Sequence, residues 1–199
     1  MSKIKYILFS VIGLLILTFI AVFYISNNQS WLKNTGVDLS IYKPYVLNTE
    51  IDFSKKGKSF KYINMKDGWG GQQPKWRISL GNESIIRLYI KDGKNKKISL
   101  HLTGWGVYNH DKDEFQRVVV FANDKNIGEW KLAENKTYSI IIPSDIMQSN
   151  ILVIRFDIKK PRLIENTNKK TGMAVTKLQL KKQSETKIKI AKWLKNAMN

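Results

Sequence analysis

Short apolar segments recur about every ten residues between Ile51 and Leu180, and this spacing limits the fold more than any other feature of the chain. The segments are rich in Ile, Val and aromatic residues, and clusters of Gly, Asn, Asp and Lys separate them. Segments this short are typical of β-strands, whereas amphipathic helices need longer runs with a period of 3.6 residues. No stretch between them is long enough for the crossover helix that parallel strands require. We therefore predict an all-β fold, an antiparallel β-sandwich of the jelly-roll kind.

The expected strands can be placed from their alternation and from the turn residues between them. Leu100 alternates with His101, so the leucine is expected to face the core and the histidine the other side. Asp92-Gly93 and Asn123-Asp124 are turn formers, and Pro143 ends the apolar run before it because proline cannot extend a ladder. The expected strands are residues 60–65, 76–80, 85–90, 98–103, 117–122, 127–132, 137–142, 152–158 and 174–180.

A continuous apolar run, Tyr6–Ile25 with Leu14 near its middle, precedes this region. A helix of that length spans roughly 30 Å, the thickness of the bilayer hydrocarbon. The run is longer than the apolar part of a cleaved signal peptide, and no small-residue cleavage site follows it, so we expect an uncleaved anchor. Lys3 and Lys5 precede the run, and the next positive charge is Lys33. The positive-inside rule then predicts a single-pass membrane protein with a cytoplasmic N-terminus and an extracytoplasmic C-terminal domain.

The last residues change from strand spacing to helical spacing. Ile190, Trp193 and Leu194 fall on one face, and lysines lie on the others, which predicts a basic amphipathic helix. This helix either attaches to an anionic membrane surface or a partner, or packs on the sandwich with its lysines in solvent. The expected organisation is an anchor at 1–26, a polar stalk at 27–50, a sandwich at 51–182 and the helix at 183–199.

The chain is strongly basic and carries no catalytic motif. Its 34 Lys and Arg against 16 Asp and Glu give a net charge of +18, which attracts phosphate-bearing polymers, acidic glycans and anionic lipids. Nucleic acid would fit the charge, but not an exported domain. The absence of cysteine excludes disulfides, thiolate metal sites and cysteine nucleophiles. His110 with the acidic residues up to Glu114 could bind calcium, but without the spacing of a known loop a solvated turn is expected. We expect no enzyme, no metal and no cofactor.

Tryptophans beside glycines and at strand ends are the candidate binding residues. Trp69 and Trp105 are flanked by glycines, which can leave a flat ring open to stack on a sugar. Core or edge packing is the alternative, above all for Trp76 and Trp130, which lie inside expected strands. The candidate ligand-binding residues are Trp69, Trp76, Arg77, Trp105, Tyr108 and Gln116.

The same segments carry a family resemblance. They are, in order, Gly68-Trp69 and Trp76, the strand and turn from Gln116 to Asp124, Ile127-Gly128-Glu129-Trp130, Ile142-Pro143, Lys160-Pro161 and Gly172-Met173-Ala174-Val175. In this order, residues 67–180 resemble the β-sandwich domain of unknown function at the end of bacterial membrane phosphoglycerol transferases and some membrane glycosyltransferases. The resemblance implies a β-sandwich without activity of its own, because catalysis in those enzymes belongs to other domains. Where those domains have an acidic residue, an Asn-Gly turn and Asp-x-Arg, this chain has Gln72 or Gln73, Asn123-Asp124 and Asn168-Lys169-Lys170.

Two functions are compatible with these observations. The first is a membrane-anchored, non-catalytic accessory protein with a carbohydrate-binding-like sandwich that assists synthesis or modification of envelope glycopolymers. Its partners would be an envelope glycan or anionic glycopolymer and a membrane enzyme. The alternative is a structural or adaptor subunit that binds protein partners through the sandwich and the terminal helices.

Overall fold

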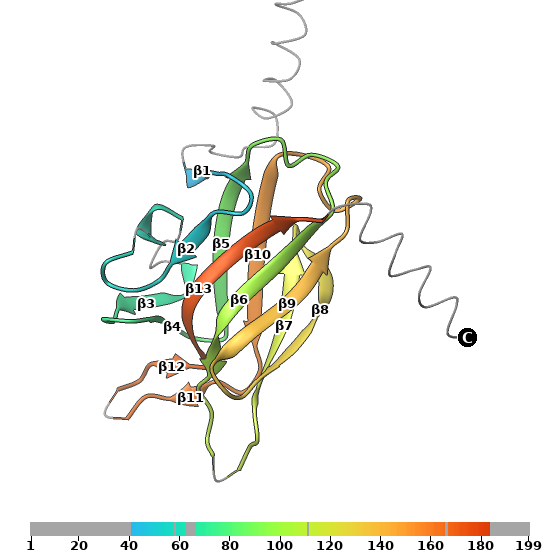
Figure 1. The fold of residues 1–199 in the computed structure, drawn as a ribbon. Coiled ribbons are helices and arrows are strands. Elements are labelled where there is room, and N and C mark those ends of the chain that lie inside the picture. The colour runs from blue at the N-terminus through green and yellow to red at the C-terminus, as the bar shows by residue number, and fades with distance from the viewer. Residues whose placement is uncertain (1–40, 58, 63–66, 111, 166, 184–199) are drawn as a thin grey trace, which may run out of the picture. The chain divides into compact units, whose positions relative to one another are not determined.

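The computed structural model describes residues 41–57, 59–62, 67–110, 112–165 and 167–183, and these form two packed β-sheets (Figure 1). The expected anchor with Tyr6, Leu14 and Ile25, most of the stalk, and the expected C-terminal helix with Trp193 lie outside the described residues. Among the residues that are described, no helix is long and apolar enough to cross a membrane.

One sheet has the strand order β1-β5-β10-β7-β8, and the other β3-β4-β13-β6-β9 with β2 also paired to β13. All neighbouring strands are antiparallel except β1 and β5. The bounds are β1 Lys43–Tyr45, β2 Glu50–Asp52, β3 Trp69–Gln72, β4 Arg77–Ser79, β5 Glu83–Ile90, β6 Ile98–Gly106, β7 Gln116–Ala122, β8 Lys125–Leu132, β9 Lys136–Ile142, β10 Ile151–Ile158 and β13 Met173–Lys182. A separate hairpin joins β11 (Arg162–Leu163) to β12 (Lys170–Thr171), and η2 is a 3-10 turn at Ser59–Lys61.

Eight of the strands, four in each sheet, follow the order of a jelly roll. Within the two sheets they are ordered β4-β13-β6-β9 and β5-β10-β7-β8, so the chain crosses repeatedly from one sheet to the other. Alternate residues of each strand face the opposite sheet; in β10, Leu152, Ile154 and Phe156 are fully buried. The prediction of an all-β sandwich is confirmed.

The expected strands from 76–80 onward are confirmed, with small shifts at their ends. The expected strand at residues 60–65 is wrong, because η2 begins there and Tyr62 donates to the Ser59 carbonyl at 2.8 Å in a turn. The expected stalk is too long at its C-terminal end, since it includes β1. Tyr45 of β1 is fully buried, and its hydroxyl donates to the Thr49 carbonyl and accepts from the Leu180 amide of β13. The sandwich therefore begins by Lys43.

The strand ends define two opposite ends of the sandwich (Figure 1). The β6–β7 end includes residues 80–82, 107–110, 112–115, 133–135, 159–165 and 167–172, among them the β11–β12 hairpin. The β5–β6 end comprises residues 41–49, 91–97, 123–124, 143–150 and 181–183. The nine residues of β6 run from one end to the other, so the ends lie about 26 Å apart.

Candidate binding site

A hollow of about 430 Å³ opens at the β6–β7 end. Three segments that are far apart in the sequence build it: the last residues of β6 with the loop that follows, the turn between β8 and β9, and the first residue of β11. Its lining residues are Trp105, Gly106, Val107, Tyr108, His110, Ala133, Glu134, Asn135 and Arg162. These residues meet because the jelly-roll order brings the three connections to one end.

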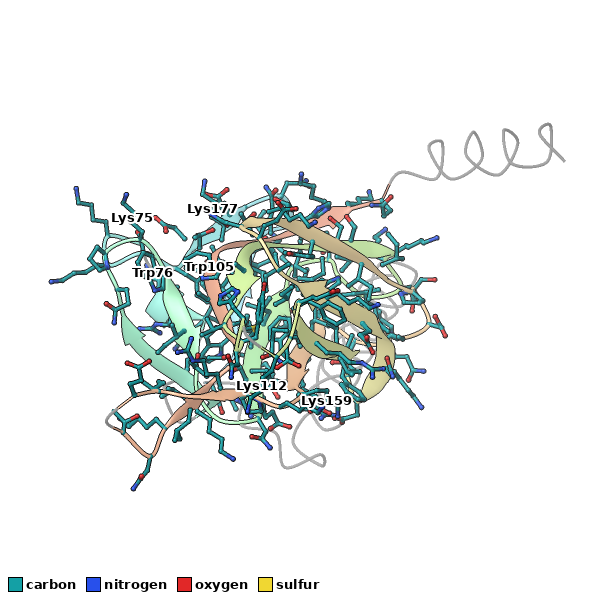
Figure 2. The ribbon with its side chains drawn as sticks, turned by 90° about the horizontal axis from the view of Figure 1, so that it is seen from below. Lys75, Trp76, Trp105, Lys112, Lys159 and Lys177 are labelled. Carbon is teal, nitrogen blue, oxygen red and sulfur yellow. The ribbon has the colours of Figure 1, made fainter. Side chains whose placement is uncertain are left out.

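Trp105, which lines this hollow, forms an indole pair with Trp76. Trp105 of β6 pairs with Ala174 of β13, and Ala174 pairs on its other side with Ile78 of β4. These three side chains therefore share the outer face of the sheet. Trp76 lies on the same face and packs edge-on against Trp105, with ring centroids 5.4 Å apart and an interplanar angle of 70°. Figure 2 shows the two rings side by side. Both side chains are half-buried, so part of each ring stays open to solvent.

Tyr108 stands between this hollow and a smaller one. Its ring contacts the imidazole of His110, with centroids 4.4 Å apart. Tyr108 also lines the neighbouring hollow of about 210 Å³, whose other residues are Asp113, Phe115, Gln116, Arg117, Lys159 and Lys160. A ligand in either hollow would therefore meet the same tyrosine.

Polar groups surround the aromatic side of the larger hollow. The Lys136 ammonium lies 2.8 Å from the Glu134 carboxylate, and its hydrogen bond and charge hold the pKa of Glu134 below the usual value. Glu134 therefore offers acceptors at neutral pH. Arg162 offers guanidinium donors, partly engaged by Glu165 at 3.1 Å, and Asn135 offers an amide. Aromatic rings beside a few donors and acceptors are the composition of a site for a polar ring-shaped ligand such as a sugar.

Two candidate residues are corrected by their burial. Trp69 is fully buried and packs between Phe53 and Phe156, and its indole donates to the Ile85 carbonyl at 2.7 Å. The expectation of an open ring is wrong for Trp69, because the glycine before it, at φ 77, permits close backbone packing on Glu83.

Arg77 points to the inner side of its sheet beside Val175 and is only 5% exposed. Its Nε has no hydrogen-bond partner, and burial lowers its pKa. This burial argues against direct contact of Arg77 with a ligand.

Gln116 supports the smaller hollow from behind. It is 2% exposed, and its amide nitrogen donates to the carbonyls of Arg117 and Lys159. Its amide oxygen is buried without a partner and faces Gly172, where a Cβ would press against it. Gln116 thus positions Lys159 and does not itself present a surface for binding.

Three of the residues that the sequence marks for binding lie at or beside the larger hollow. Trp105 and Tyr108 line it, and Trp76 supports Trp105 from the side. Trp130, by contrast, is core, stacked on Phe156 at 6.0 Å. Sequence reasoning missed Glu134, Asn135 and Arg162. The first two form an evident turn between strands, but nothing in the sequence indicates which other loop this turn approaches.

No protein-family model and no curated protein matches the chain. Among solved structures, the crystal structure of the insecticidal delta-endotoxin Cry8Ea1 from Bacillus thuringiensis matches with 9% identity and a TM-score of 0.39. That match covers 54% of this chain and 20% of the toxin.

Two carbohydrate-binding modules match over most of their own length. One is the CBM36-1 domain of a multidomain xylanase from the hindgut metagenome of Trinervitermes trinervoides, with 10% identity, a TM-score of 0.38, and coverage of 68% of this chain and 98% of the module. The other is a CBM36 in complex with calcium and xylotriose, with 9% identity, a TM-score of 0.34, and coverage of 66% and 98%. Similarity at this level carries no argument about function.

Proposed function

We propose that this protein is a membrane-anchored, non-catalytic accessory protein that binds a saccharide of the bacterial envelope in the larger hollow at the β6–β7 end. The observation that carries the proposal is the half-buried, partly open indole of Trp105 in a hollow that also holds Tyr108, Glu134, Asn135 and Arg162. Envelope glycopolymers in the course of synthesis or modification are the substrate class that such a site would serve.

The chemistry of the hollow suits a sugar ring. The C–H face of a pyranose is apolar and packs on an indole or phenol ring, while its hydroxyls need donors and acceptors at the edge. Glu134 supplies acceptors, Arg162 supplies donors and Asn135 supplies both. Several weak contacts of this kind select the shape of the ring.

The net charge and the expected location of the domain support the same proposal. The net charge of +18 raises the local concentration of phosphate- or uronate-bearing polymers, an effect that salt weakens. The apolar run Tyr6–Ile25 and the resemblance to domains of envelope-building membrane enzymes support the extracytoplasmic address.

The test is binding of the full chain, held in nanodiscs, to oligosaccharides released from envelope glycopolymers. We expect saturable binding in which Trp105→Ala weakens the affinity about tenfold or more, because the main aromatic contact is lost. Neutral oligosaccharides should bind with little dependence on salt, since stacking carries no net charge. Isothermal titration calorimetry at low and high salt measures both effects.

Tyr42→Ala is the matched control, since it removes a half-buried aromatic ring at the opposite end. Equal affinity of the parent chain and Trp105→Ala would rule out the hollow as the saccharide site. No saccharide binding, together with membrane proteins that co-purify in stoichiometric amounts, would instead favour the adaptor function.

A further inference from the structure

Seven lysines and only three carboxylates lie at the β5–β6 end of the sandwich, among the residues that the structure describes. The lysines are Lys43, Lys91, Lys94, Lys96, Lys97, Lys181 and Lys182, and the carboxylates are Asp92, Asp124 and Asp145. At the opposite end the described lysines and arginines alternate with acidic residues such as Asp113, Glu114, Glu134 and Glu165. The β5–β6 end therefore carries the larger excess of positive over negative charge.

Hydrogen bonds join the segments of this end into one surface. The Lys91 amide donates to the Tyr45 carbonyl at 3.3 Å, and the Lys94 amide donates to the Asn150 side chain at 2.9 Å. The Gln183 amide donates to the Lys97 carbonyl at 3.1 Å. The lysines of three separate segments thus stand on a common scaffold, to which residues 143–150 also belong.

Most of these lysines have no internal counter-charge. No ion pair within the described part of the chain includes Lys91, Lys94, Lys96, Lys97, Lys181 or Lys182. Elsewhere lysines are paired, as Lys159 is with Asp157 at 2.6 Å and Lys177 with Glu50 at 3.0 Å. Like charges held together without partners repel one another, and an external anionic surface relieves that repulsion.

Two further features of the same end point to a lipid surface. Ile41 and Val46 expose 51% and 63% of their surface, although they are large and apolar. The chain also enters and leaves the described domain here, at Ile41 and Gln183. The apolar run that ends at Ile25 leads in sequence to the first of these residues, and the basic segment with helical spacing follows the second.

We propose that the β5–β6 end docks on anionic lipid headgroups. Attraction between lysines and a charged leaflet fades within a Debye length of about 8–10 Å, which is short against the roughly 26 Å between the two ends. Docking at this end leaves the larger hollow facing away from the bilayer. The inference rests on the membrane anchoring in the proposed function, but not on saccharide binding.

The test compares the full chain in nanodiscs of phosphatidylcholine alone and in nanodiscs with one third phosphatidylglycerol. Acetylation of each lysine by a soluble reagent is followed by mass spectrometry. In the anionic discs we expect Lys91, Lys94 and Lys96 to react at least about threefold more slowly, an effect that high salt removes. Lys112 and Lys160, at the opposite end, should react equally in both discs.

Two triple variants with the same loss of charge separate local docking from general attraction. Lys91→Gln with Lys94→Gln and Lys96→Gln should abolish the protection of Lys181 and Lys182. The matched control Lys112→Gln with Lys160→Gln and Lys169→Gln should leave that protection intact.

Equal acetylation in the two kinds of disc, or equal slowing at both ends, would overturn the docking. Trp105→Ala should keep the protection, so a failure of saccharide binding does not imitate a failure of docking. Release of the parent chain from both kinds of disc would instead contradict the anchoring itself. As a second readout, the absence of cysteine allows single labels at Asn95→Cys and Lys112→Cys, and the first should lie closer to the lipid.

Discussion

At the scale of single residues, several that the sequence marks for binding are buried, and Trp69 and Arg77 are buried for different reasons. Trp69 is held in the core by an indole hydrogen bond that no pattern of neighbours reveals. Arg77 follows Trp76 in an alternating strand, so the exposure of one requires the burial of the other. Alternation predicts that Trp76 and Arg77 differ in exposure, but not which of them faces the core.

Arg77 leads to a prediction about stability. A buried guanidinium with an unpartnered Nε loses hydration without full compensation. Arg77→Met should therefore leave the free energy of unfolding unchanged or raise it by about 1 kcal/mol. Urea unfolding followed by tryptophan fluorescence measures the change.

The control is Arg87→Met, which removes the ion pair with Asp67 and should give no gain. A loss of more than about 1 kcal/mol in Arg77→Met would show that the remaining guanidinium nitrogens make essential contacts.

At the scale of elements, the long alternating strands are predictable and the short ones are not. Strands such as β10 bury every second residue over their full length, so their alternation of buried and exposed positions is visible in the sequence alone. β1 and β2 have three residues each, and their place depends on the strands they join, β5 and β13. The turn between β7 and β8 is predictable because Asn123 and Asp124 both accept positive φ, at 46° and 62°.

Asn123 does more than form that turn. Its side chain donates to the carbonyls of Ile146 and Ile151 and accepts from the Val153 amide at 2.8 Å, which ties the β7–β8 hairpin to β10. Asn123→Ala should therefore lower the free energy of unfolding by about 1–3 kcal/mol, since three half-buried backbone groups lose a partner. Thermal unfolding measures the loss.

Asp124→Gly, which changes the neighbouring turn residue, is the control variant. Glycine adopts positive φ without strain, so this variant should be as stable as the parent or slightly more stable. Equal stability of Asn123→Ala and the parent would show that water replaces the side-chain bonds.

At the scale of the whole molecule, the sandwich is predictable and the hollow is not. The number and spacing of strands indicate two antiparallel sheets, but the meeting of Trp105, Asn135 and Arg162 depends on the order in which strands cross between sheets. Every connection contributes to that order, and no single segment encodes it.

The stability of the whole fold should depend on Tyr45 at alkaline pH. Burial of this tyrosine, which links the N-terminal segment to β13, raises its pKa from 10.0 to about 12. The folded state holds the phenolic proton more tightly than the unfolded chain does. The resulting stabilisation is complete below pH 10 and is lost as the pH rises through about 12.

Tyr45→Phe should thus be less stable than the parent at pH 8, because the Leu180 amide loses its acceptor. The difference between the two should shrink between pH 10 and pH 12. Urea unfolding across this range tests it, with Tyr89→Phe as the control, since its hydroxyl has a single long contact of 3.4 Å with Asn150. A difference in stability that stays constant with pH would contradict the raised pKa of Tyr45.

The central place of β13 has a consequence for the time at which the domain can fold. Among the strands of the described residues it is the last in sequence, yet it stands between β4 and β6 and also pairs with β2. Until the ribosome has released residues 173–182, one sheet lacks its middle and its outer strands have no common partner. Pairings such as Ala174 with Ile78 also close long loops, which slows folding. The sheet that contains β13 can therefore be completed only late in synthesis, after residues 173–182 have left the ribosome.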